Sequence, residues 1–198
     1  MNESTDWHVP DGLSETARQV LSVDPNAYGR LTPTGAGSSR ARELLDKVRP
    51  EQLLTLPVRS PDDARCLLAG LWLFHDWLDE SHVMSQATPS ATGSFWHAMM
   101  HRREGDFPNA KYWYARCRRH PALAQIAGEG RAALEALPER KVLGRLVTDA
   151  WDPDGFVDVV EAIHRKAEDP LYHAAVRLQR AEWRVLFAHC AQAATAKP

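Results

Sequence analysis

The residues whose types and spacing point most clearly to chemistry are His97, His101 and Glu104. Side chains four and three residues apart share one face of a helix, so these three would form a narrow polar stripe. Imidazole nitrogens and a carboxylate oxygen are ligands for Zn²⁺ or Fe²⁺, and three of them leave a position for water or substrate. The spacing would suit a divalent-metal site formed by His97, His101 and either Glu104 or His82. The glutamate of an HExxH metallopeptidase is missing, because Ala98 stands in its place.

Two further polar rows with helical spacing, one before and one after this stripe, extend the candidate site. Antiparallel helix pairs would bring the three rows together and form a polar groove. Since a buried polar group left unpaired costs about 1–3 kcal/mol, the members of the groove must find partners there. We expect the groove to be lined by His75, Asp79, His82, Gln86, His97, His101, Glu104, Asn109, Tyr112 and Arg116.

Three interpretations of this groove are open. In the first, His97 and His101 donate hydrogen bonds to Asp79, Glu104 or backbone carbonyls and only stabilise the fold. In the second, a zinc or iron ion supports hydrolysis or oxygen chemistry, with Asp79 or Glu104 as the catalytic acid or base. In the third, the groove is a metal-free pocket for a small molecule or a peptide segment of a partner. The function we expect is a ligand- or partner-binding module, and the alternative is a metal-dependent enzyme.

The helices that must position these residues are marked by their first residues. Ser60-Pro61, Asp152-Pro153 and Asp169-Pro170 each place a capping side chain before a proline at the first helical position. Strands do not alternate with helices, so the predicted class is all-α. The expected helices span 14–21, 39–48, 61–74, 77–87, 93–104, 107–119, 121–137, 153–166 and 170–194.

The segment 105–121 contains a Gly-Asp turn, a small residue, aromatic residues one turn later and a terminal proline. These residues are Gly105, Asp106, Ala110, Trp113, Tyr114 and Pro121. The segment thereby resembles the second half of a tetratricopeptide or Sel1-type repeat. The resemblance implies stacked antiparallel helical hairpins in a right-handed array over 60–137, flanked by the last two helices. The central block also resembles an uncharacterised family of bacterial and fungal proteins, which implies a shared fold and no particular reaction.

The domain organisation we expect has two parts. Residues 1–59 would form a loosely packed N-terminal arm with short helices, because the stretch 23–39 is rich in proline, glycine, serine and threonine. Residues 60–198 would form a single α-helical domain.

Composition and charge exclude several classes of protein. The net charge of −2 gives no electrostatic reason for nucleic acid or an anionic membrane as partner. The apolar runs are too short to span a bilayer, and the polar N-terminus lacks the apolar segment of a signal peptide. Cys66, Cys117 and Cys190 are odd in number and far apart, which favours reduced, buried thiols. We expect a soluble cytoplasmic protein.

Two other polar features have a structural interpretation. The run Arg102-Arg103-Glu104 is typical of a solvated helix end with ion pairs along the helix, although it would also suit a phosphate or carboxylate. Gln179 and Glu182 interrupt the apolar stripe of the last helix. We expect these two side chains to make tertiary hydrogen bonds.

Overall fold

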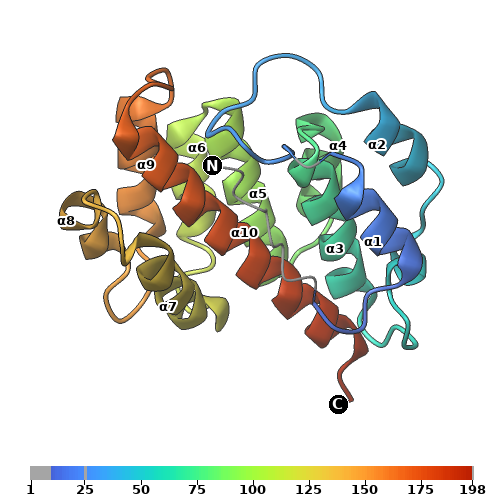
Figure 1. Cartoon of the computed structure of the whole chain (residues 1–198). Coiled ribbons are helices and arrows are strands. Elements are labelled where there is room, and N and C mark those ends of the chain that lie inside the picture. Colours follow the sequence, from blue (N-terminus) through green and yellow to red (C-terminus); the bar gives the residue numbers. More distant parts are fainter. Residues whose placement is uncertain (1–9, 25, 198) are drawn as a thin grey trace.

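A computed structural model describes residues 10–24 and 26–197, so the first nine residues of the expected arm lie outside the described part. Within that part the chain forms ten α-helices, two short 3₁₀ segments and no sheet, which confirms the all-α class. The helices are α1 (Glu15–Ser22), α2 (Ser39–Leu45), α3 (Pro61–Phe74), α4 (Leu78–Gln86), α5 (Ala91–Glu104), α6 (Phe107–Tyr114), α7 (Ala122–Leu134), α8 (Arg140–Leu143), α9 (Pro153–Ile163) and α10 (Pro170–Thr195) (Figure 1). The 3₁₀ segments are η1 (Pro50–Leu53) and η2 (Gly144–Leu146).

The caps identified in the sequence start three helices where they were predicted. Ser60, Asp152 and Asp169 each accept a hydrogen bond from a backbone N–H of the first turn. The proline that follows has no backbone N–H, which costs nothing because an N–H at the first helical position has no partner within the helix. The prediction for α6 was too long, since from Arg116 onward the backbone N–H groups bond to carbonyls three residues back instead of four.

The middle of the chain stacks its helices in sequence order. α3 packs on α4, α4 on α5, and α5 on α6. The long helix α10 packs on α7, α3 and α9, and Figure 1 shows it crossing the molecule diagonally. The expected packing of adjacent helices is therefore confirmed.

The described part of the segment before residue 60 also contributes to the core. Val20, Tyr28 and Leu31 are fully buried. The ring of Tyr28 stacks on Phe74 with their centroids 6.0 Å apart, and the N–H of Leu31 donates to the hydroxyl of Tyr172 at 3.1 Å. The chain after α1 therefore lies against α3 and α10.

Helix α5 is enclosed by its neighbours, and every residue from Thr92 to Arg103 is buried. The side chains of Arg102 and Arg103 are 0% exposed, so the expectation of a solvated helix end is wrong. A buried charge is tolerated only when it is paired. Arg102 pairs with Glu182 at 2.6 Å, and Arg103 pairs with Asp76 at 2.7 Å. The first pair confirms the tertiary interaction expected for Glu182.

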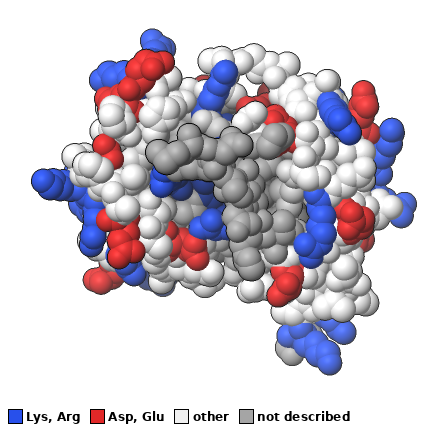
Figure 2. All heavy atoms as spheres, in the orientation of Figure 1, with Lys and Arg blue, Asp and Glu red and all other residues white. Residues whose placement is uncertain are grey.

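The described surface mixes charges of both signs. On the face shown in Figure 2, basic and acidic side chains are interspersed around the rim. Among the described helices, none is long and apolar enough to cross a lipid bilayer.

Candidate metal centre

Three consecutive helices build the candidate site. α4 supplies His82, α5 supplies His97 and His101 one turn apart, and α6 covers them with Asn109 and Trp113. Because residues four apart on a helix lie on one face, the two pairs on α5 and α6 point toward each other across the same contact.

Two glycines allow these helices to approach closely. A Cβ atom at Gly93 would lie 2.1 Å from the backbone oxygen of Thr88, so the connection between α4 and α5 closes only around glycine. Gly105 has φ of +91° and ends α5 in the left-handed conformation that favours glycine. Asp106 then caps α6 by accepting from the N–H of Asn109. The chain thereby folds α6 back onto α5.

The structure brings His82, His97 and His101 together. One ring nitrogen from each lies within 4.8 Å of the other two. The ring centroid of His97 is 4.6 Å from that of His82 and 4.6 Å from that of His101. His97 and His101 are buried and His82 is half-buried. This is the predicted ligand set in which His82 is the third member.

His97 is the central residue of this cluster. It is 1% exposed, and neither of its ring nitrogens has a hydrogen-bond partner among the described residues. Its ring stacks on Trp113 with the centroids 4.0 Å apart. Burial, and after it the proximity of His101 and His82, lowers the pKa of His97 to about 3. The ring is therefore neutral at pH 7 and has a lone pair for a metal ion. The hydrogen-bond network expected for the histidines does not extend to His97.

His101 is held from two sides. Its Nδ1 lies 2.5 Å from Oε1 of Glu104, and its Nε2 lies 3.1 Å from Nδ2 of Asn109. When Nδ1–H donates to the carboxylate, Nε2 accepts from the amide. A carboxylate on the second nitrogen of a ligating histidine fixes the tautomer and the orientation of the ring. In this geometry Glu104 supports His101 instead of acting as a free ligand.

A second group of candidate ligand atoms shares His101. One atom each from His101, Glu104 and Asp106 lies within 4.8 Å of the others. Both acids are exposed. Because Glu104 is bonded to His101 and Asp106 caps α6, this group is already satisfied by protein partners.

The α3 and α4 members of the expected groove, apart from His82, lie elsewhere. His75 is buried, and its Nε2–H donates to the carbonyl of Val20 in α1 at 2.9 Å. Asp79 is exposed and lines a separate hollow with Trp72. Gln86 is exposed at the end of α4. His75 and Asp79 therefore make their contacts away from the histidine cluster.

The α6 members form an outer layer of the site. Tyr112 is 53% exposed, and the guanidinium carbon of Arg116 lies 3.9 Å from the centre of its ring. The same guanidinium lies 4.9 Å from the centre of the Trp113 ring. Trp113 is thus in contact with both Arg116 and His97, although it was not among the residues expected to line the groove. Trp113 lies four residues after Asn109, and this spacing indicates that the two side chains share one face of α6.

The thiols offer no alternative nucleophile. Cys66, Cys117 and Cys190 are buried and free, as the sequence predicted. Burial raises the pKa of Cys117 to about 12, which leaves the thiol protonated at neutral pH.

Comparisons with known proteins identify no relative of this chain. No protein-family model, no curated protein and no solved structure matches the chain. The resemblance to tetratricopeptide and Sel1-type repeats therefore depends on residues 105–121 alone. The chain is an all-helical protein with a buried histidine cluster whose donor atoms could hold a metal ion.

Proposed function

We propose that this protein binds one divalent metal ion of the zinc type through His82, His97 and His101. The observation that carries the proposal is His97, a buried imidazole between two others with both nitrogens unpaired. Leaving buried polar groups in this state costs about 1–3 kcal/mol each. Coordination of a metal ion would compensate for that cost at one of the two nitrogens of His97.

The donor set fits the metal. Neutral imidazoles suit Zn²⁺ and also Cu²⁺, Ni²⁺ and Fe²⁺. Zinc–nitrogen bonds of 2.0–2.1 Å in a tetrahedral site would need ring nitrogens roughly 3.3 Å apart. The nitrogens lie within 4.8 Å of one another, and the stacked rings of His97 and His101 would have to rotate until their in-plane lone pairs converge on the ion. Asn109, half-buried in the first turn of α6, would have to turn away from Nε2 of His101.

The number of ligands indicates the kind of centre. Three histidines leave a fourth tetrahedral position open, as in catalytic zinc sites, whereas structural zinc sites use four protein ligands. Water in such a position has a pKa of about 7 and can attack a polarised carbonyl or phosphoryl group. Metal-assisted hydrolysis is therefore the reaction class that we propose for this centre.

The proposed site would also join two structural units. We propose that α3–α4 and α5–α6 are the successive hairpins that the repeat resemblance implies, because neighbouring helices pack in sequence order. His82 belongs to the first pair and His97 and His101 to the second. A metal ion would link the two pairs.

The test measures metal content and coordination. The protein is purified without a histidine tag, stripped with a chelator and dialysed against Zn²⁺ or Co²⁺. We expect one equivalent of bound metal and, with Co²⁺, the visible absorption bands of a tetrahedral site. His97→Leu should lose both, since it removes the central ligand.

The matched control is His173→Leu, which removes an exposed histidine of α10 outside the cluster. This variant should retain one equivalent of metal. If the wild-type protein held no more metal than His97→Leu, the proposal would be wrong. Circular dichroism of each variant confirms that the helices are intact.

A further inference from the structure

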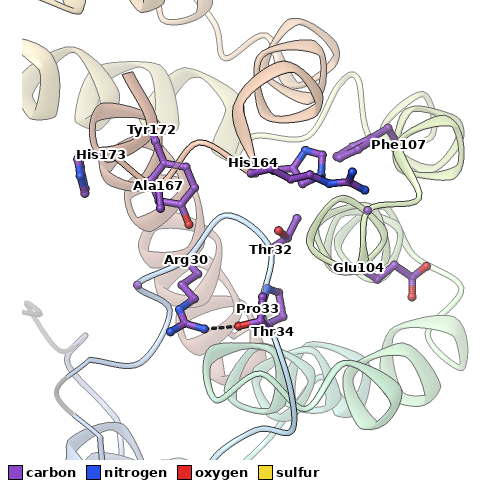
Figure 3. Close-up of a pocket in the computed structure, with 13 residues that line it drawn as sticks. Arg30, Thr32, Pro33, Thr34, Glu104, Phe107, His164, Ala167, Tyr172 and His173 are labelled. Atoms are coloured by element: carbon purple, nitrogen blue, oxygen red, sulfur yellow. Dashed lines mark hydrogen bonds between the residues drawn. The ribbon is translucent and has the colours of Figure 1, made fainter. Parts of the chain in front are cut away.

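A hollow beside Glu104 lies between four segments of the chain. The loop 29–34, the turn between α5 and α6, the residues directly after α9 and the first turn of α10 surround a cavity of about 800 Å³ (Figure 3). Small-molecule sites typically have volumes of 300–1,000 Å³. The cavity is therefore large enough for an organic ligand.

Cationic side chains from two of these segments line the cavity. Arg30 comes from the loop and Arg165 follows α9. Neither guanidinium has an acidic partner within 4.0 Å among the described residues. Arg30 donates to the hydroxyl of Thr34, an interaction drawn in Figure 3. Both charges are therefore available to an anion.

His164 orients the second arginine. Its Nδ1 lies 3.0 Å from the carbonyl oxygen of Glu161 and donates to it, so Nε2 is left as an acceptor. Nε of Arg165 donates to that Nε2 at 3.1 Å. This bond uses Nε and leaves the two terminal nitrogens of Arg165, which can form a bidentate contact with a carboxylate or phosphate.

The cavity contains little negative charge. Among its lining residues Glu104 is the one carboxylate, and it is bonded to His101. Figure 3 shows its carboxylate directed away from Thr32 and Pro33. Hydroxyl groups of Thr32, Thr34 and Tyr172 add hydrogen-bonding capacity.

We propose that this cavity binds a small organic anion through its phosphate or carboxylate group. Arg30 and Arg165 would bind the charged group, and the Tyr172 hydroxyl, which already accepts from the N–H of Leu31, would donate its own hydrogen to it. Phe107 supplies an apolar wall for the rest of the ligand. The inference does not rest on the histidine cluster holding a metal.

The test titrates metal-free protein with two probes, inorganic pyrophosphate and citrate, and measures the heat of binding. We expect saturable binding of at least one probe, and the tighter one identifies the group as phosphate or carboxylate. Arg30→Met and Arg165→Met keep the aliphatic stem and remove the charge. Each should weaken binding about tenfold, because a charge-assisted bidentate contact is lost. The Arg30 substitution keeps the backbone carbonyl that accepts from Arg103 and Gln179.

Two controls separate this site from other effects. Arg145→Met removes an exposed arginine outside the cavity and should bind the probe as the wild type does. His97→Leu should also bind it normally, so failure of the metal proposal would leave this one intact. If neither probe bound saturably, or if both arginine variants bound like the wild type, the proposal would be overturned. An equal loss in Arg145→Met would show nonspecific attraction and would overturn it too.

Discussion

Two buried polar clusters meet on α5, and they are satisfied in opposite ways. Around Glu182, both carboxylate oxygens accept: Oε2 from Arg102 at 2.6 Å, and Oε1 from Tyr114 and Trp151 at 2.9 Å each. Around His97, three imidazoles face one another and the central ring has no hydrogen-bond partner among the described residues. Protein atoms satisfy both oxygens of Glu182, although Nε of Arg102 has no partner among the described residues, whereas both nitrogens of His97 lack one.

The difference shows how a structural network can be told from a ligand site. Burying either group costs desolvation free energy, but the Glu182 carboxylate recovers it through three hydrogen bonds within the chain and the His97 ring does not. A group that remains unpaired in a well-packed interior is a candidate for binding something else. The following experiments test this contrast.

The largest effect is expected at Glu182. Glu182→Gln removes the charge that balances Arg102 in the interior and should lower the free energy of unfolding by about 3–5 kcal/mol. Denaturant titration of the metal-free protein measures it. Glu129→Gln is the matched control. Glu129 of α7 pairs at the surface with Arg184, which lies on the same helix α10 as Glu182. This substitution should cost at most about 1 kcal/mol. Equal losses of unfolding free energy in the two variants would show that the buried pair at Glu182 contributes no more than the surface pair at Glu129.

The next largest effect is expected at Glu104, which orients His101 in the histidine cluster. Glu104→Gln removes the carboxylate that orients His101 and should weaken zinc binding about 10- to 100-fold. Competition with a chromogenic chelator measures the affinity. Glu80→Gln, on α4 and paired with Arg42, should leave it unchanged. An unaltered affinity in Glu104→Gln would mean that the carboxylate has no role in the site.

A smaller effect is expected from His120, a buried histidine with both nitrogens bonded. Nε2 lies 3.2 Å from the hydroxyl of Thr92, and Nδ1 accepts from the N–H of Ala122 at 3.2 Å. Burial, followed by repulsion from His189, lowers the pKa of His120 to about 4. The unfolded chain, in which a histidine has a pKa of about 6.5, binds more protons between these values.

The stability of the metal-free protein should therefore fall as the pH is lowered from about 6.5 to about 4. His120→Asn, which keeps an acceptor without a titrating ring, should show a shallower decrease over this window. Unfolding free energies measured at several pH values test this. A profile as steep as that of the wild type would exclude His120 as a source of the pH dependence.

The smallest effect, near zero, is expected for His97→Leu without metal. The substitution removes two unpaired polar atoms and keeps an apolar side chain against Trp113, so the free energy of unfolding should equal or exceed that of the wild type. His120→Leu is the contrasting variant and should lose about 1–3 kcal/mol, because Thr92 and Ala122 lose their partner. A loss at His97 as large as at His120 would indicate that His97 is bonded within the protein.

The sequence by itself determined the class and much of the helix pattern. Ser60, Asp152 and Asp169 mark helix starts because a cap and a proline act within one turn, so neighbours in sequence suffice to specify them. Similarly, the spacing of His97 and His101 placed both rings on one face of α5. The choice of His82 as a third ligand was open in the sequence and was one of two alternatives.

Only the tertiary structure decided which polar residues share a site. Whether a face of α5 meets water or another helix depends on all the helices packed around it, and this is why Arg102 and Arg103 are buried against expectation. His75 shares a helical face with Asp79 and His82 in a simple pattern, yet the chain turns between α3 and α4 at Asp76, whose φ is +66°, and His75 bonds to Val20 instead. Trp113 and Glu182 acquired their roles through contacts made across the fold. Local spacing fixes the direction of a side chain on its own helix, and the packing of the helices fixes what it meets.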